Sequence, residues 1–212
     1  MDVMGSRTHR INEKGPFKMN QIHEVTTLKN DQDLVARSVN DPAAFAELYD
    51  HYLPRIYKYI RYRTGNSYEA EELTSRVFEL VVAKIGSYKK EKAPFNSWIF
   101  AIAHNTLIDH MRAQKRNRCV SIEWMDQIAS TDNSPVETLI RREKVDTLLK
   151  AMKRLDDREG DLIGLKFAAG LTNGTISEIT GLTKSNVAVI IYRAVQRLKS
   201  ELCAVGWDLD DE

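Results

Sequence analysis

Apolar residues recur at three- and four-residue steps along most of this 212-residue chain, and this spacing constrains the fold more than any other feature. The spacing places apolar side chains on one face of an α-helix. The clearest example begins at Asp41 and Pro42, a capping residue followed by proline at the first helical position. It continues through Phe45, Leu48 and Ile56. No segment shows the sustained two-residue alternation that is typical of strands. The sequence therefore predicts an all-α protein.

Proline, glycine and capping residues divide this pattern into separate helices. Pro54 is expected to kink or interrupt the first helix, and Gly65 is expected to end it. Asn66 or Ser67 can cap the next helix, which Gly86 should stop. A third helix is then expected from about residue 95 to residue 115.

The expected helices form two groups. Residues 1–30 are polar and without a sustained period, which predicts a flexible tail. Residues 116–133 lose the helical period, which predicts a flexible linker. We therefore predict one helical module over residues 31–115, a second over residues 134–203, and an acidic tail over residues 204–212.

The second module carries strong helix-start signals. Capping boxes are expected at residues 134–137 and 156–159, and the helix that begins at the second box should stop near Gly170. The module ends in two helices, at about residues 173–180 and 184–202, which a tight turn containing Gly181 joins. This arrangement is typical of a helix-turn-helix, whose second helix presents its first turn to base edges. A hairpin in an ordinary helical bundle gives the same pattern, so both interpretations stay open.

Positive charge is concentrated in the first module. Residues 51–120 contain 13 basic and 6 acidic residues, although the formal net charge of the chain is only +1. The helix expected at about residues 95–115 combines aromatic, amide and basic side chains, including Trp98, Asn105 and Arg112. Single-stranded DNA is held by such a combination. An aromatic core beside a solvated basic face would look the same.

Several functional classes lack support in the sequence. Cys119 and Cys203 are too few for a disulfide scaffold, and no C-x-x-C pair is available for zinc. His104 and His110 are six residues apart, so they lie on different helix faces and cannot share a metal. No nucleophile elbow, glycine-rich phosphate loop or long apolar run occurs. We expect a cytoplasmic protein with no catalytic residues, no cofactor, no metal and no membrane contact of its own.

Four segments match one known family in order and at the right separations. They are AEELTSRVF at residues 70–78, FNSWIFAIAHNTLIDHMR at residues 95–112, Ser134-Pro135-x-Glu137 together with residues 155–171, and residues 181–198. In these segments the chain resembles regions two and four of the extracytoplasmic-function (ECF) sigma factors of bacterial RNA polymerase. The resemblance covers about residues 33–203.

The resemblance implies an alternative sigma factor that binds core RNA polymerase and directs promoter recognition, promoter melting and transcription initiation. It implies binding to core polymerase through Glu72, Leu73, Arg76 and Val77. It implies binding to the single-stranded minus-ten element through Asn96, Ser97, Trp98, Asn105, Asp109, Arg112, Lys115 and Arg116. It implies binding to the duplex minus-35 element through Lys184, Ser185, Asn186, Ala188, Val189, Tyr192 and Arg193. An anti-sigma factor is a further implied partner.

Some residues allow other interpretations. Trp98 can be a core residue, and Asp109 can serve to pair Arg112. Ala188, Val189 and Ile190 stand where the family often has Lys and Arg, and Thr175 to Ser177 stand where it often has Glu-Ile-Ala. Fewer cations give fewer phosphate contacts and a weaker salt dependence. A stand-alone helix-turn-helix regulator and a polymerase-binding adaptor without promoter recognition are the alternatives; the first leaves residues 66–116 unexplained.

Overall fold

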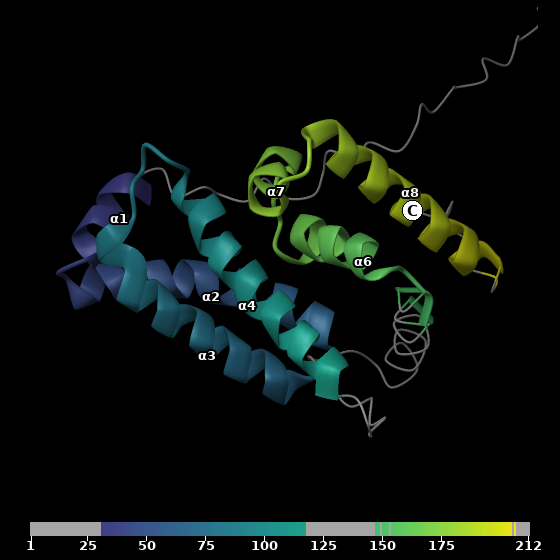
Figure 1. Cartoon of the computed structure of the whole chain (residues 1–212), viewed down its shortest axis with the longest axis horizontal. Helices are drawn as coiled ribbons and strands as arrows, with labels where there is room; N and C mark the ends of the chain where they lie inside the picture. The colour runs from purple at the N-terminus through teal and green to yellow at the C-terminus, as the bar shows by residue number, and fades with distance from the viewer. Residues whose placement is uncertain (1–30, 118–146, 149, 153, 205, 207–212) are drawn as a thin grey trace, which may run out of the picture.

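The computed structural model describes residues 31–117, 147–148, 150–152, 154–204 and 206. Within these residues every regular element is helical, which confirms the all-α prediction. Figure 1 shows the arrangement, and the elements are α1 (Asp31–Ser38), α2 (Pro42–Thr64), α3 (Ser67–Lys84), η1 (Ile85–Ser87), α4 (Phe95–Asn117), α6 (Asp157–Ile163), η2 (Gly164–Ala168), α7 (Asn173–Thr180) and α8 (Lys184–Ala204). None of the described helices is long and apolar enough to cross a membrane.

Local capping explains where the helices begin. The Asp41 carboxylate accepts a hydrogen bond from the backbone N–H of Ala43 at 2.9 Å at the start of α2. At the start of α6, Asp156 and Glu159 form the complete capping box, with hydrogen bonds of 2.7 and 3.1 Å. Gly65 ends α2 in the left-handed conformation, with a φ of 70°. These three sequence expectations are confirmed.

Three other features differ from the sequence expectation. Helix α2 continues through Pro54 without interruption, because Tyr52 and Ile56 on either side of it are anchored in the core. Helix α1 was not expected, and it is held by its buried Leu34 and Val35. Helix α4 extends to Asn117, two residues into the predicted linker.

The helix expected from Asp156 to Gly170 changes its winding part of the way along. It is α-helical only to Ile163 and then continues as the π-helix η2. The Ala169 N–H donates to the Gly164 carbonyl at 3.0 Å, five residues back, which is the π-helical pattern. Gly170, with a φ of 68°, then turns the chain toward α7.

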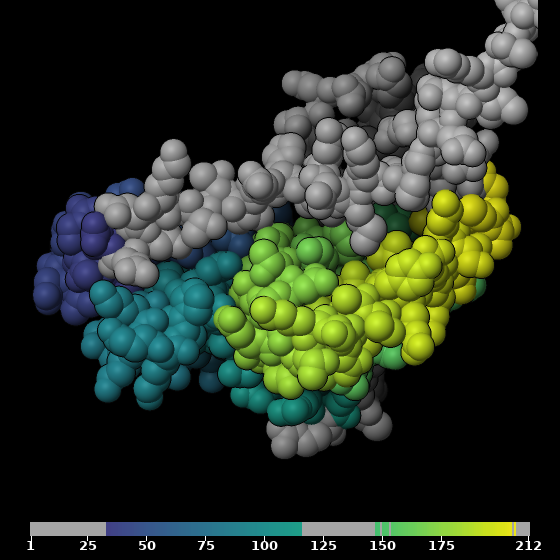
Figure 2. All heavy atoms as spheres, turned by 90° about the horizontal axis from the view of Figure 1, so that it is seen from above, coloured from purple at the N-terminus to yellow at the C-terminus, as the bar shows by residue number. Residues whose placement is uncertain are grey.

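The two groups of helices share one hydrophobic core. Helices α2, α3 and α4 pack on one another, while α6 and α7 pack on α8. Helix α4 also packs on α7, and α2 packs on η2, so that buried residues such as Phe100 and Leu107 belong to the same cluster as Leu165 and Ile176. Figure 2 shows the green and yellow C-terminal helices in contact with the teal segments.

Several predicted segments lie outside the described residues. They are the tail at residues 1–30, residues 118–133 of the linker, the capping box at residues 134–137, and residues 207–212 of the acidic tail. The predicted domain boundaries therefore stay predictions.

Candidate nucleic-acid interface

An aromatic cluster fixes the start of helix α4. The Phe95 ring lies 5.2 Å from the Tyr88 ring and 5.3 Å from the Trp98 ring, measured between centroids. The Tyr88 hydroxyl donates to the Ala93 carbonyl at 2.9 Å, which closes the loop before the helix. Trp98 is partly buried against the core in this cluster, so its ring has a packing role here whatever else it contacts.

The outer face of α4 is polar and exposed. Asn105, Asp109, Arg112 and Lys115 follow one another at three- or four-residue steps, and all four are exposed. The Asp109 carboxylate lies 3.6 Å from the Arg112 guanidinium, as an ion pair one turn apart. Both side chains are more than 70% exposed, so this pair contributes little stability and leaves Arg112 accessible.

The beginning of α4 is covered instead. Ser97 is 4% exposed, and its hydroxyl donates to the Glu178 carboxylate of α7 at 2.5 Å. Asn96 is half-buried, and its side-chain oxygen is buried without a hydrogen-bond partner. At the other end of the helix, Lys115 forms an ion pair with Asp157 of α6. The side chain of Arg116 lies outside the described part of the chain.

Helix α8 presents a separate exposed face. Gly181, with a φ of 71°, ends α7, and the Thr183 hydroxyl accepts a hydrogen bond from the Asn186 N–H at 3.2 Å, which caps α8. Val187 and Ile191 anchor the helix in the core. All seven residues predicted for minus-35 binding are exposed: Lys184, Ser185, Asn186, Ala188, Val189, Tyr192 and Arg193.

The four residues predicted for polymerase binding lie on two different faces of helix α3. Glu72 and Arg76 are exposed, whereas Leu73 and Val77 are buried in the core, with Val77 at 0% exposure. The apolar pair faces inward because α3 packs on α2 and α4. Only Glu72 and Arg76 of the four are therefore available to a partner in this structure.

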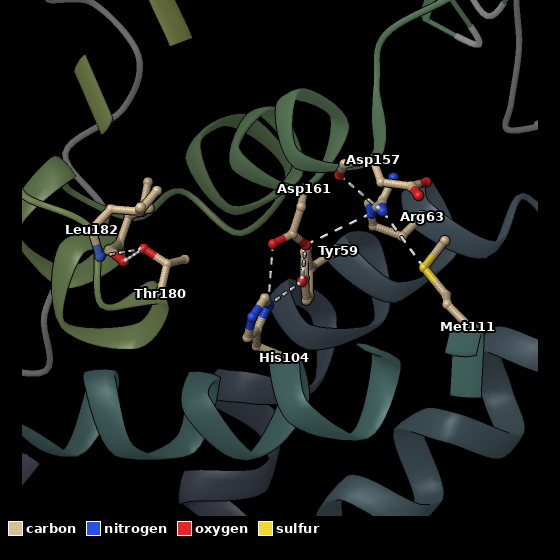
Figure 3. A network of polar contacts seen from close by, with 9 residues as sticks. Tyr59, Arg63, His104, Met111, Asp157, Asp161, Thr180 and Leu182 are labelled. Carbon is tan, nitrogen blue, oxygen red and sulfur yellow. Dashed lines mark hydrogen bonds and ion pairs between the residues drawn. The ribbon is translucent and has the colours of Figure 1, made fainter. Parts of the chain in front are cut away.

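A buried polar network lies between the two groups of helices, and the sequence analysis did not identify it (Figure 3). The Tyr59 hydroxyl donates to the Asp161 carboxylate at 2.6 Å. His104 Nδ1 lies 3.2 Å from the other Asp161 oxygen and 3.1 Å from the Tyr59 hydroxyl. Arg63 Nε lies 3.7 Å from Asp161, and an Arg63 amino group donates to the Asp157 carbonyl at 3.3 Å. The one sign of this network in the sequence is that the acidic residue Asp161 directly precedes the apolar residues Leu162 and Ile163.

Burial and the neighbouring charge set the protonation of the tyrosines in this network. Burial, followed by the Asp161 carboxylate, raises the pKa of Tyr59 well above its usual value. Burial likewise raises the pKa of Tyr62 to about 12. Tyr59 therefore stays protonated at neutral pH and acts as a hydrogen-bond donor to Asp161.

Comparisons with known proteins agree with this geometry. The Sigma-70 region 2 family model matches residues 48–117, which run from within α2 to the end of α4. The ECF RNA polymerase sigma factor BldN of Streptomyces coelicolor is 29% identical over 167 residues, which are 78% of this chain and 63% of BldN. The ECF sigma factor SigD of Mycobacterium tuberculosis is 26% identical over 178 residues, which are 82% of this chain and 84% of SigD.

Over most of its length this chain is similar to the ECF sigma factors of bacterial RNA polymerase. A solved structure of the sigma factor RpoE from Bartonella quintana, in complex with the anti-sigma factor NepR, shares the fold, with a TM-score of 0.62. That likeness covers 75% of this chain and 96% of RpoE at 21% identity, so it concerns the fold alone. The chain spans 63% of the length of BldN, which is less than two thirds.

Proposed function

We propose that this protein is an ECF sigma factor, which binds core RNA polymerase and directs it to promoters as an alternative specificity subunit. The observation that carries the proposal is the exposed polar face of α4, formed by Asn105, Asp109, Arg112 and Lys115, within the segment that matches Sigma-70 region 2. The chain itself performs no covalent chemistry. It acts where the polymerase is, in the cytoplasm.

The α4 face would hold the unpaired non-template strand of the minus-ten element. Arg112 and Lys115 supply positive charge for phosphates, while Asn105 offers an amide for a base edge. A base stacked on a protein contributes about 1–3 kcal/mol. Melting costs about 1.4 kcal/mol of stacking for each base-pair step. Capturing a few unpaired bases therefore offsets much of the cost of opening the promoter.

The exposed face of α8 would read the minus-35 element in the major groove. Lys184, Ser185 and Asn186 lie in its first turn, where a recognition helix meets base edges. Ala188 and Val189 can contact thymine methyl groups. Lys184 and Arg193 are the two cations of the predicted set, so the electrostatic part of this contact is small.

Helix α3 would contact the core polymerase. Glu72 and Arg76 place one negative and one positive charge on its exposed face. Charged residues at an interface determine the orientation of the partners more than the binding affinity. An anti-sigma factor is a further partner, because RpoE of Bartonella quintana, which shares the fold, was solved in complex with one.

Transcription with purified core polymerase on a library of randomised promoters tests this function. We expect transcripts that depend on the sigma factor and that select one two-part promoter sequence. A sigma factor that binds core polymerase but produces no transcript would be an adaptor. Sequence-specific binding of duplex DNA without polymerase would indicate a stand-alone regulator.

A further inference from the structure

A cavity of about 210 Å³ lies between three helices, close to the end of α4. It is lined by Arg63 of α2, by Ile108, Met111, Arg112 and Lys115 of α4, and by Asp157 of α6. Ile108 lies three and four positions before Met111 and Arg112, and Lys115 lies four and three positions after them, so the four residues share one side of α4. Ligand sites commonly form in such concave places between helices.

Arg63 is the most buried cation of this lining, with a side chain that is 10% exposed. Figure 3 shows its guanidinium between Met111 and Asp157. One amino group donates to the Met111 sulfur at 3.5 Å and to the Asp157 carbonyl at 3.3 Å, and Nε is buried without a hydrogen-bond partner among the described residues. Sulfur is a weak acceptor, and 3.3 Å is long for a bond from nitrogen to oxygen. Because a buried charge is costly unless it is well bonded, this guanidinium can gain from a stronger oxygen acceptor.

The charge of the lining suits one phosphate group. Three cations and one carboxylate give it a net charge of +2, and a phosphate monoester carries about −1.5 to −2 at pH 7. Arg112 and Lys115 are paired with Asp109 and Asp157, but all four side chains are more than half exposed, and such pairs are weak enough to exchange for another anion. The Asp157 carboxylate would repel a second phosphate, whereas it can accept hydrogen bonds from sugar hydroxyls.

The apolar part of the lining suits an organic body next to the phosphate. Ile108 and Met111 are half-buried, and inorganic phosphate would leave their apolar surface unused. The methionine sulfur also makes favourable contacts with aromatic rings. A cavity of about 210 Å³ is smaller than the sites that hold drug-sized ligands, so it admits little more than one phosphate and one ring system. Phosphate, sugar hydroxyls and a flat ring together describe a nucleotide.

We propose that this cavity binds a free nucleoside monophosphate, with the phosphate among its three cations and the base against its two apolar side chains. A nucleotide unit of a DNA strand has the same chemistry, so the experiment below separates the two sources. Binding of the free nucleotide needs neither polymerase nor promoter. A bound nucleotide would compete with the minus-ten strand for Arg112 and Lys115, and this consequence alone rests on the proposed function.

Nuclear magnetic resonance of isotope-labelled methionine methyl groups in the full chain measures this binding. We expect the Met111 resonance, which Met111→Leu identifies by removing it, to shift and saturate with adenosine or cytidine monophosphate at a dissociation constant below about 1 mM. Met152 does not line the cavity, so its resonance should stay in place. The matching nucleoside and inorganic phosphate each carry half of the chemistry and should bind at least about tenfold more weakly. No saturable shift, or equally tight binding of inorganic phosphate, would overturn the proposal.

Substitutions of the cations test where the phosphate lies. Lys115→Gln removes one charged contact at an exposed position and should weaken nucleotide binding about tenfold. Lys58→Gln is the matched control, because Lys58 is an exposed lysine of α2 that does not line the cavity. Arg63→Gln should weaken binding further, and if this buried substitution prevents folding, Lys115→Gln still decides the question. Equal affinities of the parent chain, Lys115→Gln and Lys58→Gln would overturn the proposal.

A parallel titration with a single-stranded oligonucleotide of randomised sequence separates the two sources of the nucleotide. A Met111 resonance that responds to the oligonucleotide but not to the free nucleotide would assign the cavity to DNA binding and contradict the proposal. A shift with the free nucleotide supports it, whatever the oligonucleotide does. Failure of the proposed function looks different: the chain would support no transcription with core polymerase, while the free nucleotide would still move the Met111 resonance.

Discussion

At the scale of single residues, one carboxylate connects side chains from three helices. Asp161 is buried and contacts Tyr59 and Arg63 from α2 and His104 from α4. The sequence analysis could not predict this network, because Tyr59 and Asp161 are 102 positions apart. Periodicity shows which residues face inward, but it does not show which inward polar groups meet. Capping residues such as Asp156 and Glu159 were predictable, since their partners lie within one turn.

Tyr59→Phe should destabilise the fold. The substitution leaves an Asp161 oxygen buried without its hydroxyl donor, and such a loss costs about 1–3 kcal/mol. Urea denaturation should show this decrease in the free energy of unfolding without a change in the slope against denaturant. Tyr68→Phe, at an exposed position, is the control and should leave the midpoint in place. Equal effects of the two substitutions would contradict a role for the network.

Alkaline pH should destabilise the fold through the same tyrosines. The folded chain holds the Tyr59 and Tyr62 protons more tightly than the unfolded chain does, because burial raises both pKa values. Below about pH 10 both states are protonated and nothing is lost. Above it, each tyrosine lowers the free energy of unfolding by about 1.4 kcal/mol per pH unit, for Tyr62 until about pH 12. Denaturation series from pH 9 to about pH 12 should show a shallower decline for Tyr62→Phe.

At the scale of elements, helix faces were predicted better than contacts between helices. Val187 and Ile191 of α8 are four residues apart, as helical apolar spacing requires, and both are buried. The family resemblance, in contrast, grouped Leu73 and Val77, which are buried, with Glu72 and Arg76, which are exposed on the same helix. The family pattern names whole segments, whereas burial decides which side chains a partner can touch. The exposed residues of α3 and those of α4 therefore form two surfaces, and substitutions on the two surfaces can be compared.

Arg112→Ala and Arg76→Ala should separate promoter opening from polymerase binding. Arg112 lies on the exposed face of α4, so its loss should reduce open-complex formation about tenfold while core binding is unchanged. Arg76 lies on the exposed face of α3, so its loss should weaken core binding instead. Permanganate footprinting of the melted strand and a core-binding titration measure the two effects. Equal loss of both activities in both variants would mean that the surfaces are not separate.

Lys184→Ala should change how minus-35 binding depends on salt. Removing one cation that binds a phosphate reduces the slope of log affinity against log salt concentration by about one. Because Lys184 is one of two cations among the seven residues predicted for minus-35 binding, the change should be a large share of their electrostatic contribution. The measurement is binding of holoenzyme to duplex promoter over a range of salt concentrations. Lys199→Ala, an exposed cation further along α8, should leave the slope unchanged.

At the scale of the whole molecule, two modules that the sequence separates are joined by a single core. The sequence predicted a linker and two modules because the helical period is lost between them. The sequence could not predict how the modules pack on each other, since each apolar helix face could be buried within its own module. Gly160 and Gly164 permit this close packing because the side chains of Arg63, Tyr62 and Tyr59 lie opposite them. The sequence does not show that these residues are neighbours.

The shared core makes a prediction about cooperativity. Hydrogen exchange followed by mass spectrometry should show α4 and α6 losing protection together as urea is added, because opening either exposes the same buried cluster. In Gly164→Ala the two should separate, because a Cβ atom on Gly164 would lie 2.7 Å from a ring carbon of Tyr62 in α2. Helices α6 to α8 should then exchange at lower urea than α2 to α4, since the smaller group of helices keeps less core of its own. Gly86→Ala is the control and should behave as the parent chain does, because a Cβ atom on Gly86 would meet Val39 at 3.9 Å, an ordinary contact. Separate loss of protection in the parent chain would mean that the modules open independently and that the contact between them contributes little free energy.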